Sequence, residues 1–323
     1  MTAPPDEFEW IASLRGLTRG DPRALGLLDD AAIIPGRQGF DMVVSTDTMV
    51  EGVHFLSDER PSTIARRLLR TSLSDLAAKA AKPFGYFLTT AWPANRGRAY
   101  RQAFAEGLAG DGDEFGISLL GGDTVATGGP MVFTATVLGW SPSGGAVLRS
   151  GARPGDIVVV CGVIGDGWLG LRAARGEITD PGGRLASHYR LPKPLLNLRD
   201  VLSLHAHGAA DVSDGLLADA SHVATASRCG VDIELSALPL SISAATWCAG
   251  QDQEDRARLD LASGGDDYAL VCAVPPAEEV EFRRGVSALG VPAAAVGVFR
   301  VGDGVEVRLR GQRVDPQHFG WRH

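Results

Sequence analysis

Aspartate dominates the residues of this chain whose type and spacing could support chemistry. Most of these aspartates end apolar runs and stand beside Gly, Ser or Thr. Neighbouring carboxylates repel one another unless a positive group lies between them. Hard oxygen ligands suit Mg²⁺, which in turn commonly binds phosphates, so the pattern predicts a site with several metal ions and a phosphate-bearing ligand. The segments are Leu28-Asp29-Asp30, Ser45-Thr46-Asp47, Ser74-Asp75, Gly121-Gly122-Asp123-Thr124, Asp211-Val212-Ser213-Asp214-Gly215 and Gly264-Gly265-Asp266-Asp267.

A β-branched run delivers a hydroxyl and a carboxylate at its end, in the segment Ser45-Thr46-Asp47. Ligand sites of α/β proteins tend to lie where such strands end, so we expect this segment to contribute to a ligand site. Asp30 is a less specific candidate, because adjacent aspartates often do no more than form a turn. His54 follows the strand and is either a structural residue or a hydrogen-bonding partner of the substrate.

Asp75 lies in a segment with helical periodicity. Between residues 62 and 81 apolar side chains recur at helical spacing, and Lys82-Pro83 ends the run. Asp75 stands one turn from Thr71 and two turns from Leu68, so it borders the apolar face of the predicted helix.

Two further segments have both a chemical and a structural explanation. Gly122 and Asp123 could bring main-chain N–H groups to a phosphate and a carboxylate to its counter-metal, or could form a tight hairpin turn. Ser213 or Asp214 could cap the helix predicted to follow them. A cap does not explain the second carboxylate, Asp211, and two carboxylates at the positive end of a helix favour a metal–phosphate site.

The run Gly165-Asp166-Gly167-Trp168-Leu169-Gly170 matches G-x-G-x-x-G after a predicted strand. This motif indicates a dinucleotide-binding fold when an acidic residue ends a strand about 20 residues later. Here Trp168 is bulky for a turn against a pyrophosphate, and Gly183 and Arg184 stand near the acidic position. We interpret the glycines as serving close packing between a strand and a helix. The sequence has no Walker P-loop pattern, which excludes an ordinary P-loop kinase.

The composition is that of a globular protein. The chain has 323 residues, a length sufficient for two domains or one large one, and 45% of the residues are hydrophobic and 22% charged. A net charge of -8 argues against nonspecific nucleic-acid binding but not against a nucleotide, since bound Mg²⁺ can reverse the local sign. No apolar run approaches the ~20 residues of a membrane span, and residues 1–10 lack the basic residues of a secretory signal. The four cysteines form no CxxC, so we expect reduced thiols in a cytoplasmic protein.

Strands alternate with helices along the chain, which predicts an α/β (α+β) fold in two halves. Residues 140–156 are rich in Ser, Pro and Gly and are expected to join two domains, 1–148 and 149–323. Strands are expected at 42–48, 117–120, 131–140 and 156–161, and helices at 62–81, 168–175 and 213–229.

Six segments in order resemble the motifs of the thiamine-monophosphate kinases, members of the aminoimidazole ribonucleotide synthetase-like superfamily. The resemblance spans nearly the whole chain. It implies the two-domain fold of that superfamily, with an N-terminal metal- and ATP-binding domain whose sheet pairs across a homodimer, and a C-terminal α/β domain. The matching segments are Ser45-Thr46-Asp47-Thr48 with Gly52-Val53-His54-Phe55, Leu73-Ser74-Asp75-Leu76-Ala77-Ala78, Leu120-Gly121-Gly122-Asp123-Thr124, Arg149-Ser150-Gly151-Ala152-Arg153-Pro154-Gly155-Asp156, Asp211-Val212-Ser213-Asp214-Gly215-Leu216 and Gly264-Gly265-Asp266-Asp267-Tyr268.

The resemblance also implies an activity, the transfer of the γ-phosphate of ATP to thiamine monophosphate to give thiamine diphosphate. The acceptor phosphate is already ionised near pH 7, so no general base or covalent catalytic residue is expected. Metal ions that bridge and neutralise the phosphates would overcome the repulsion that opposes direct in-line transfer. By resemblance, Mg²⁺ would be held by Asp30, Ser45, Thr46, Asp47, Asp75, Asp123, Asp211 and Asp214, ATP by Gly122, Asp123, Arg149 and Ser213, and the substrate by His54 and Asp266.

Three positions depart from the family pattern. Leu28 stands where the family usually has Gly before the two aspartates, and Asp266 stands where it usually has Glu. Pro316 stands where the family has an aromatic residue that stacks on the substrate. In this chain such stacking would have to come from elsewhere, with Trp321 as a candidate, or be absent.

Other enzymes of the same superfamily are the nearest alternatives. Selenophosphate synthetase would need a reactive cysteine near the N-terminus, yet no cysteine precedes Cys161. The hydrogenase-maturation relative ends in cysteine, whereas the last residue of this sequence is His323. Aminoimidazole ribonucleotide synthetase fits the segments 45–55 and 74–78 less well. From other classes, the alternatives are a dinucleotide-dependent oxidoreductase and a noncatalytic nucleotide-binding regulator.

Overall fold

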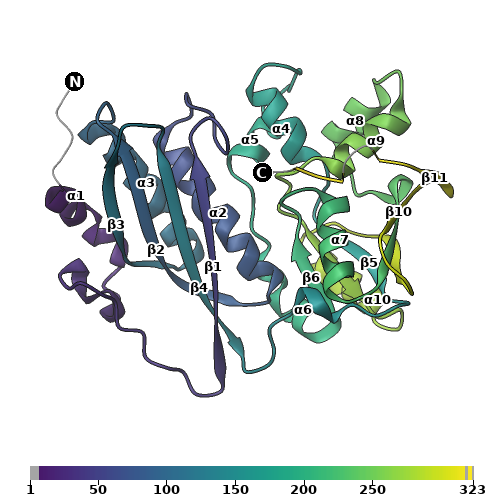
Figure 1. Ribbon diagram of the computed structural model, residues 1–323, viewed down its shortest axis with the longest axis horizontal. Helices are drawn as coiled ribbons and strands as arrows, with labels where there is room; N and C mark the ends of the chain where they lie inside the picture. The colour runs from purple at the N-terminus through teal and green to yellow at the C-terminus, as the bar shows by residue number, and fades with distance from the viewer. Residues whose placement is uncertain (1–6, 317–318, 322–323) are drawn as a thin grey trace. The chain divides into compact units, whose positions relative to one another are not determined.

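The computed structural model describes residues 7–316 and 319–321, and their side chains from Glu9 onward. The chain forms two compact units (Figure 1). The first comprises the residues up to Leu76 together with Ala81–Gly144, and the second comprises Ala77–Ala80 together with the residues from Gly145 onward. The main division therefore falls inside the segment 140–156. The first six residues, which bear on the predicted absence of a secretory signal, lie outside the described residues.

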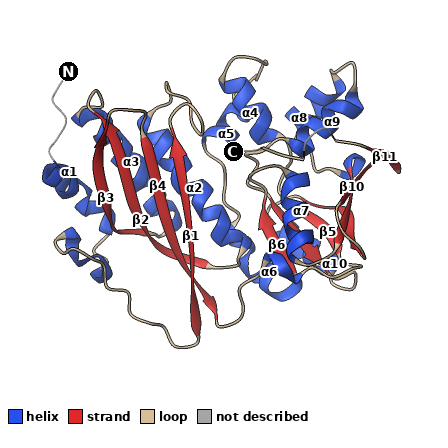
Figure 2. Ribbon diagram, in the orientation of Figure 1, coloured by secondary structure: helices blue, strands red, loops and turns tan. Residues whose placement is uncertain are grey.

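The first unit is built on a four-stranded sheet. Its strand order is β1 (Phe40–Val50), β4 (Val132–Pro142), β2 (Lys82–Pro93) and β3 (Ser118–Thr127). The pairs β1–β4 and β4–β2 are antiparallel, and β2–β3 is parallel. Figure 2 shows α2 (Pro61–Ala78) and α3 (Arg98–Phe115) against one face of this sheet. The remaining helical segments of the unit are α1 (Glu7–Leu14), η1 (Arg15–Thr18) and η2 (Pro22–Leu27).

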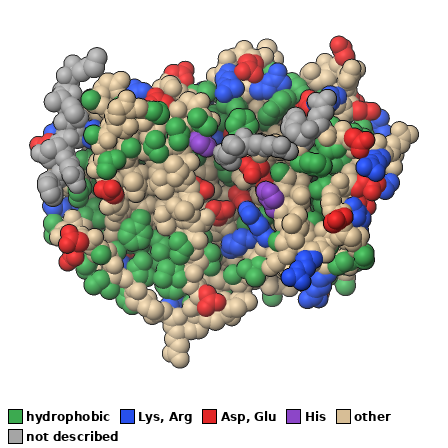
Figure 3. Space-filling model, viewed as in Figure 1, with side chains coloured by type: hydrophobic (Ala, Val, Ile, Leu, Met, Phe, Trp, Pro, Cys, Tyr) green, Lys and Arg blue, Asp and Glu red, His purple; other side chains and the backbone are tan. Residues whose placement is uncertain are grey.

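Side-chain alternation gives this sheet two different faces. Leu88 and Phe133 point toward the helices and are 3% and 0% exposed. On the other face, which we call the open face, Met42, Val44 and Val125 are 40%, 55% and 46% exposed. Figure 3 shows hydrophobic side chains gathered over this sheet. The open face therefore carries apolar side chains that the described residues of the unit leave partly uncovered.

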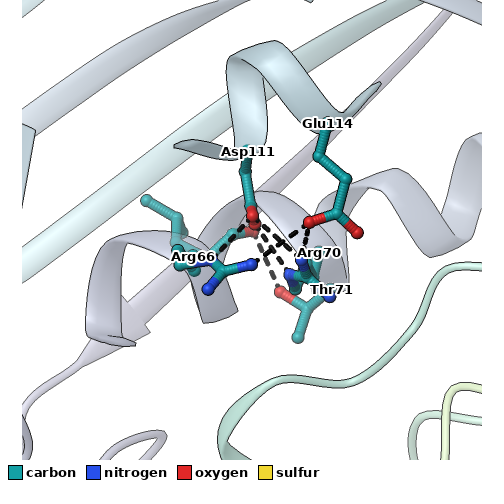
Figure 4. Close-up of polar contacts among 6 residues, drawn as sticks. Arg66, Arg70, Thr71, Asp111 and Glu114 are labelled. Carbon is teal, nitrogen blue, oxygen red and sulfur yellow. Dashed lines mark hydrogen bonds and ion pairs between the residues drawn. The ribbon is translucent and has the colours of Figure 1, made fainter. Parts of the chain in front are cut away.

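A buried ion network ties α2 to α3 (Figure 4). Asp111, which is fully buried on α3, accepts hydrogen bonds from Arg70 at 2.8 and 2.9 Å and from Arg66 at 2.7 Å. Glu114, one turn further along α3, also binds Arg70 at 2.5 Å. Because a buried charge is costly without its partner, this network fixes the position of α2 against α3. Asp75 lies on α2 and depends on that position.

We predict that Asp111→Ala lowers the free energy of unfolding by about 3–5 kcal/mol, because it leaves two arginines without their buried partner. Denaturant unfolding of the wild type and the variant measures this change. Asp113→Ala, on the same helix, is the matched control, since its side chain is 77% exposed and pairs only at the surface with Arg19. The control should lose less than about 1 kcal/mol. Equal losses in both variants would contradict the assigned role of Asp111.

The second unit is an α/β layer structure with a seven-stranded mixed sheet. Figure 1 shows helices on both sides of it. The strand order is β11 (Gln312–Val314), β10 (Val305–Leu309), β7 (Gly230–Glu234), β9 (Ala293–Arg300), β5 (Ile157–Cys161), β8 (Leu270–Val274) and β6 (Gly208–Asp211). The helices are α4 (Asp166–Ala174), α5 (Arg184–Arg190), α6 (Arg199–His205), α7 (Leu216–Ala226), α8 (Ile242–Ala249), α9 (Glu254–Ser263) and α10 (Glu279–Ala288), with short turns η3 (Arg149–Gly151), η4 (Leu196–Leu198) and η5 (Leu235–Ala237).

The central strand β5 shows why this sheet is covered on both faces. Val158 and Val160 pack in one core with residues of α7, such as Leu217. Val159 and Cys161 pack in another core with Leu202 of α6 and Phe282 of α10. A continuous run of apolar residues is typical of a strand with no solvated face.

The elements expected from the sequence are present, with shifted ends. The strands predicted at 42–48, 117–120, 131–140 and 156–161 are confirmed as β1, β3, β4 and β5, and the three predicted helices as α2, α4 and α7. The strand β2 was not predicted, because Lys82-Pro83 at its start looked only like a helix end. In the described part of the chain, no helix has the length and apolar character required to cross a membrane.

Candidate active site

The first group of candidate residues lies where β1 meets α2. Ser45 and Asp47 are two residues apart on a strand, so they point to the same face of the sheet, toward the helices. The Ser45 hydroxyl donates a hydrogen bond of 2.5 Å to Asp75 Oδ2. Ser72, one turn before Asp75, hydrogen-bonds Asp47. We call Ser45, Asp47, Ser72 and Asp75 the β1–α2 cluster.

The β1–α2 cluster holds two carboxylates that repel each other. Burial, and after it the negative charge of Asp75, raise the pKa of Asp47 from 3.8 to about 6, although the hydrogen bond from Ser72 opposes both. The folded chain therefore keeps a proton on Asp47 in mildly acidic solution unless another cation is present. Two carboxylates and a serine hydroxyl are the hard oxygen donors that suit Mg²⁺.

Thr46 points to the opposite side of the sheet. Its hydroxyl lies on the open face, 2.9 Å from that of Thr136 on β4. The predicted metal ligand Thr46 is thus separated from Asp47 by the sheet itself, as expected for neighbours on a strand. The structure does not bring its side chain to the β1–α2 cluster.

Asp123 also lies on the open face. Strand register places Gly122 in one row with Leu88, Ala135 and Asp47, and places Asp123 in the next row with Thr134. Three strand spacings separate β1 from β3, roughly 14 Å. Within one chain, Asp123 and Asp47 therefore cannot ligate the same ion.

Gly122 is required by close packing between strands. A Cβ atom at this position would lie 1.8 Å from the carbonyl oxygen of Leu88 on β2. The two glycines thus lie in a strand and not in the tight hairpin turn considered as an alternative.

Asp30 and His54 lie outside the β1–α2 cluster. Asp30 is exposed, and its N–H donates to Asp29 Oδ1 at 2.8 Å, the local bond typical of aspartates in turns. His54 accepts the N–H of Val50 at Nδ1, 3.1 Å away, so the neutral ring carries its proton on Nε2. This bond fixes the ring at the end of β1.

The second group of candidates surrounds the loop between β6 and α7. Asp211 is the last residue of β6 and is 4% exposed. The helix begins at Leu216 after Gly215, so neither Ser213 nor Asp214 is its cap, and the structural alternative considered for them is wrong. The loop is instead held from inside the helix, because Asp219 Oδ2 accepts the N–H groups of Ser213, Asp214 and Gly215 at 3.0, 3.1 and 3.2 Å.

A second segment crosses this loop and brings Asp266 to it. The N–H of Asp266 donates to the carbonyl of Ser213 at 2.8 Å, and that of Tyr268 donates to the carbonyl of Val212 at 2.8 Å. Asp266 has a φ of 70°, a left-handed conformation that costs free energy in a residue with a side chain. The Tyr268 hydroxyl donates to Asp266 Oδ1 at 3.1 Å. Asp266 and Ser213 are therefore fixed beside each other by the main chain.

Asp267 explains the glycine-rich run 165–170. Its carboxylate is buried and accepts the N–H groups of Gly165 and Gly167, both at 2.8 Å. Burial raises the pKa of this carboxyl well above its usual range. A Cβ atom at Gly167 would lie 2.2 Å from the carbonyl carbon of Asp266. The glycines serve close packing, as predicted, but they pack against helices and the main chain at Asp266 and not against a strand. The N–H groups of Gly165 and Gly167 bind the Asp267 carboxylate, where a dinucleotide-binding motif would bind a pyrophosphate.

Three more side chains complete the surroundings of the β6–α7 loop. Arg149 is exposed on η3, and its carbonyl accepts the hydroxyl of Ser227 at the end of α7. His222 Nδ1 lies 3.4 Å from Asp219 Oδ1, and this partner raises the pKa of His222. The N–H of Trp321 donates to the carbonyl of Asp214 at 2.9 Å, and the Trp321 side chain is 59% exposed.

Asp214, Asp219 and His222 each offer a ligand atom, and these atoms lie within 4.8 Å of one another. The sequence analysis missed Asp219 and His222. Their spacing could have indicated them. Asp219 and His222 are three residues apart, so they share a face of the predicted helix, and they follow Asp214 by about one and two helical turns.

Two family models match the chain, one to each half. The model described as AIR synthase related protein, N-terminal domain, matches residues 28–141, and its C-terminal counterpart matches residues 153–310. The chain belongs to the AIR synthase related protein family. The predicted α/β fold class with an N- and a C-terminal domain is confirmed.

Curated proteins similar to this chain include several thiamine-monophosphate kinases. The one from Caulobacter vibrioides is 55% identical over 99% of this chain and 92% of its own length, and the one from Escherichia coli K12 is 35% identical over 84% and 83%. The solved structure of the enzyme from Stenotrophomonas maltophilia K279a is 30% identical and has a TM-score of 0.83, covering 97% of this chain and 99% of its own. The resemblance inferred from the six motifs is therefore confirmed.

We predict that Asp47→Asn stabilises the metal-free protein at pH 7.5 and not at pH 4. The folded-state pKa of Asp47 is raised to about 6, so the folded protein binds this proton more tightly than the unfolded chain. Stability is therefore lost as the pH rises from about 4 through 6, by up to about 3 kcal/mol. Asparagine cannot ionise and avoids that loss.

Thermal unfolding with a chelator present, at both pH values, measures this difference. Asp58→Asn is the matched control, because Asp58 is an exposed aspartate of the same unit, and its melting temperature should follow the wild type at both pH values. An Asp47→Asn variant no more stable than the wild type at pH 7.5 would show that burial and the charge of Asp75 do not destabilise the ionised Asp47 as described.

Proposed function

We propose that this protein transfers the γ-phosphate of ATP to thiamine monophosphate and forms thiamine diphosphate. The observation that carries the proposal is the 55% identity, over 99% of the chain, with a thiamine-monophosphate kinase. The paired carboxylates Asp47 and Asp75 support it, because their repulsion is relieved by the metal ions that phosphoryl transfer requires.

The donor atoms of both clusters fit Mg²⁺. The β1–α2 cluster offers Asp47, Asp75 and the Ser45 hydroxyl, and the β6–α7 loop offers Asp211 and Asp214, all hard oxygen ligands. Bound Mg²⁺ would supply neutralisation of the phosphate charges and would bridge their oxygens. The side chains themselves need move no proton, because the phosphate acceptor is already ionised near neutral pH. We therefore propose direct in-line transfer without a phosphoenzyme.

The other candidates receive roles that follow their positions. Arg149 and Ser213 would contact ATP, since a guanidinium and a hydroxyl can both donate to phosphate. Asp266 is fixed beside Ser213 and would face the substrate, together with His54. Trp321 would supply stacking in place of Pro316, because its exposed side chain follows a main chain anchored at Asp214. Asp30 keeps its proposed metal role on resemblance alone.

We also propose that two copies pair through their open faces. Met42, Val44 and Val125 expose an apolar surface there, beside the hydroxyls of Thr46 and three further threonines of β1 and β4. Burial of such a face on a second copy removes apolar area from water. Pairing would also place the Asp123 side chain at the interface between copies, since it lies on the open face. Thr46 would lie at the same interface.

The cytoplasm is the proposed location. Four free and buried cysteines lie in the described part of the chain, a pattern typical of a reducing compartment. The net charge of -8 supports small-molecule partners over nucleic acid.

The direct test is conversion of thiamine monophosphate to thiamine diphosphate with ATP, with and without Mg²⁺. We predict product only with Mg²⁺, and loss of at least roughly 100-fold in kcat for Asp75→Asn and Asp211→Asn with the fold intact, since even outer-shell partners of a metal cost 10–100-fold. Asp252→Asn, an exposed aspartate of the second unit, is the control and should keep wild-type turnover. Near-normal turnover in both site variants would reject the metal argument. Binding of Mg–ATP without any product would indicate another acceptor or a regulatory role.

For the pairing of copies, we predict that Val44→Lys yields a monomer, because a charge on the open face would be buried without a partner. Light scattering after size exclusion measures the mass. Val280→Lys, on the surface of α10 with 58% exposure, is the matched control and should leave the mass unchanged. A wild-type monomer would contradict the proposed pairing.

A further inference from the structure

Asp219 is a buried carboxylate without a role in the function proposed above. It lies in the first turns of α7 and is 1% exposed. One of its oxygens, Oδ2, accepts main-chain N–H groups from Ser213, Asp214 and Gly215. A carboxylate that accepts several N–H bonds fixes the conformation of the segment that donates them. Asp219 therefore determines the shape of the loop that presents Ser213 and Asp214.

These bonds occupy the donors that a phosphate would otherwise use. These donors belong to the loop residues that directly precede α7, which begins at Leu216. Successive main-chain N–H groups in such a loop can form an anion-binding site. Here they bind the protein's own carboxylate, which also brings a negative charge to the same place. A bare phosphate would have to displace Asp219 and would be repelled by it. Direct binding of a metal-free phosphate to these loop N–H groups therefore does not fit the geometry.

The second oxygen of Asp219 points toward other site residues. Oδ1 lies 3.4 Å from His222 Nδ1, and a ligand atom of Asp214 lies within 4.8 Å of both residues. The Asp219 carboxylate thus binds the main chain of the loop through Oδ2 and lies close to His222 of the helix and to Asp214 through Oδ1. Loss of that carboxylate would release the loop and reduce the negative charge beside Asp214.

We propose that Asp219 is a positioning residue that makes the β6–α7 loop accept phosphate only as a metal complex. By filling the main-chain donors, it excludes the free anion. By fixing the loop, it directs the side chains of Ser213 and Asp214 toward the metal-bound phosphate. This inference rests on the proposed function for the identity of the nucleotide, but it is tested by binding alone.

The test compares Asp219→Ala, Asp219→Asn and the wild type by calorimetry, with a nonhydrolysable ATP analogue in Mg²⁺ and with pyrophosphate in a chelator. Asp219→Ala should bind the Mg–analogue at least about 10-fold more weakly, because a group that orients metal ligands is lost. The same variant should bind metal-free pyrophosphate at least about 10-fold more tightly than the wild type, because its amides are vacated. A residue with a merely structural role would not produce this gain.

Asp219→Asn keeps an oxygen that can accept the three N–H bonds, so its affinity for the Mg–analogue should lie closer to the wild type than that of Asp219→Ala. It also keeps the inference testable if the alanine variant does not fold. Glu234→Ala is the matched control: Glu234 likewise accepts three main-chain N–H groups, from Ser236, Arg310 and Gly311, away from the candidate residues. This control should lose stability and leave both affinities unchanged.

Two results would overturn the inference. One is unchanged affinity of Asp219→Ala for both ligands, and the other is a wild type that binds pyrophosphate as well as the Mg–analogue. A wild type that binds the Mg–analogue selectively but forms no thiamine diphosphate would reject the proposed function and leave the role of Asp219 standing.

Discussion

The repulsion between Asp47 and Asp75 is the interaction on which the candidate site depends. Each carboxylate is hydrogen-bonded by a serine of the other's element, Asp75 by Ser45 of β1 and Asp47 by Ser72 of α2. Burial strengthens the repulsion between the two charges. Without a cation the folded protein retains a proton at Asp47 below about pH 6. Above that pH the arrangement costs stability in the metal-free protein, and a divalent ion that neutralised the two charges would recover that free energy on binding.

The surrounding fold maintains this costly arrangement. α2 carries Ser72 and Asp75, and the buried pairing of Arg70 with Asp111 fixes that helix against α3. β1 carries Ser45 and Asp47 on the helix-covered face of a sheet whose register is set by β4. In the second unit, Asp219 plays a comparable part, because one buried carboxylate holds three consecutive main-chain groups. In each unit the candidate residues are thus positioned by a buried carboxylate that accepts several hydrogen bonds, Asp111 in the first unit and Asp219 in the second.

The sequence was sufficient for the order of the motifs, the helix that carries Asp75 and the strand that carries Ser45 and Asp47. These follow from apolar periodicity and from residue types with a clear chemical preference. The position of Thr46 on the opposite face was also implicit in the alternation of side chains along a strand. The separation of Asp123 from Asp47 was not, since it depends on a strand order that places β4 and β2 between them.

The role of Asp219 could not be predicted for a different physical reason. In the sequence Asp219 is a polar residue among the apolar residues of a predicted helix. Side chains that bind the main chain at a helix start are expected before the helix, at positions such as Ser213 or Asp214, and not inside it. Its reach back to the loop depends on the sharp turn at Gly215, where a Cβ atom would lie 2.8 Å from the carbonyl oxygen of Ser263. Such contacts between distant segments leave no local pattern.

The most direct measurement of the central claim is the number of protons released when Mg²⁺ binds. Calorimetric titration at pH 6 and pH 8, in buffers of different ionisation enthalpy, yields this number. With the pKa of Asp47 at about 6, binding should release roughly half a proton at pH 6 and almost none at pH 8, and Asp47→Asn should abolish the release at pH 6. Binding of Mg²⁺ without proton release at pH 6, or a release that Asp47→Asn leaves unchanged, would contradict the account of the paired carboxylates.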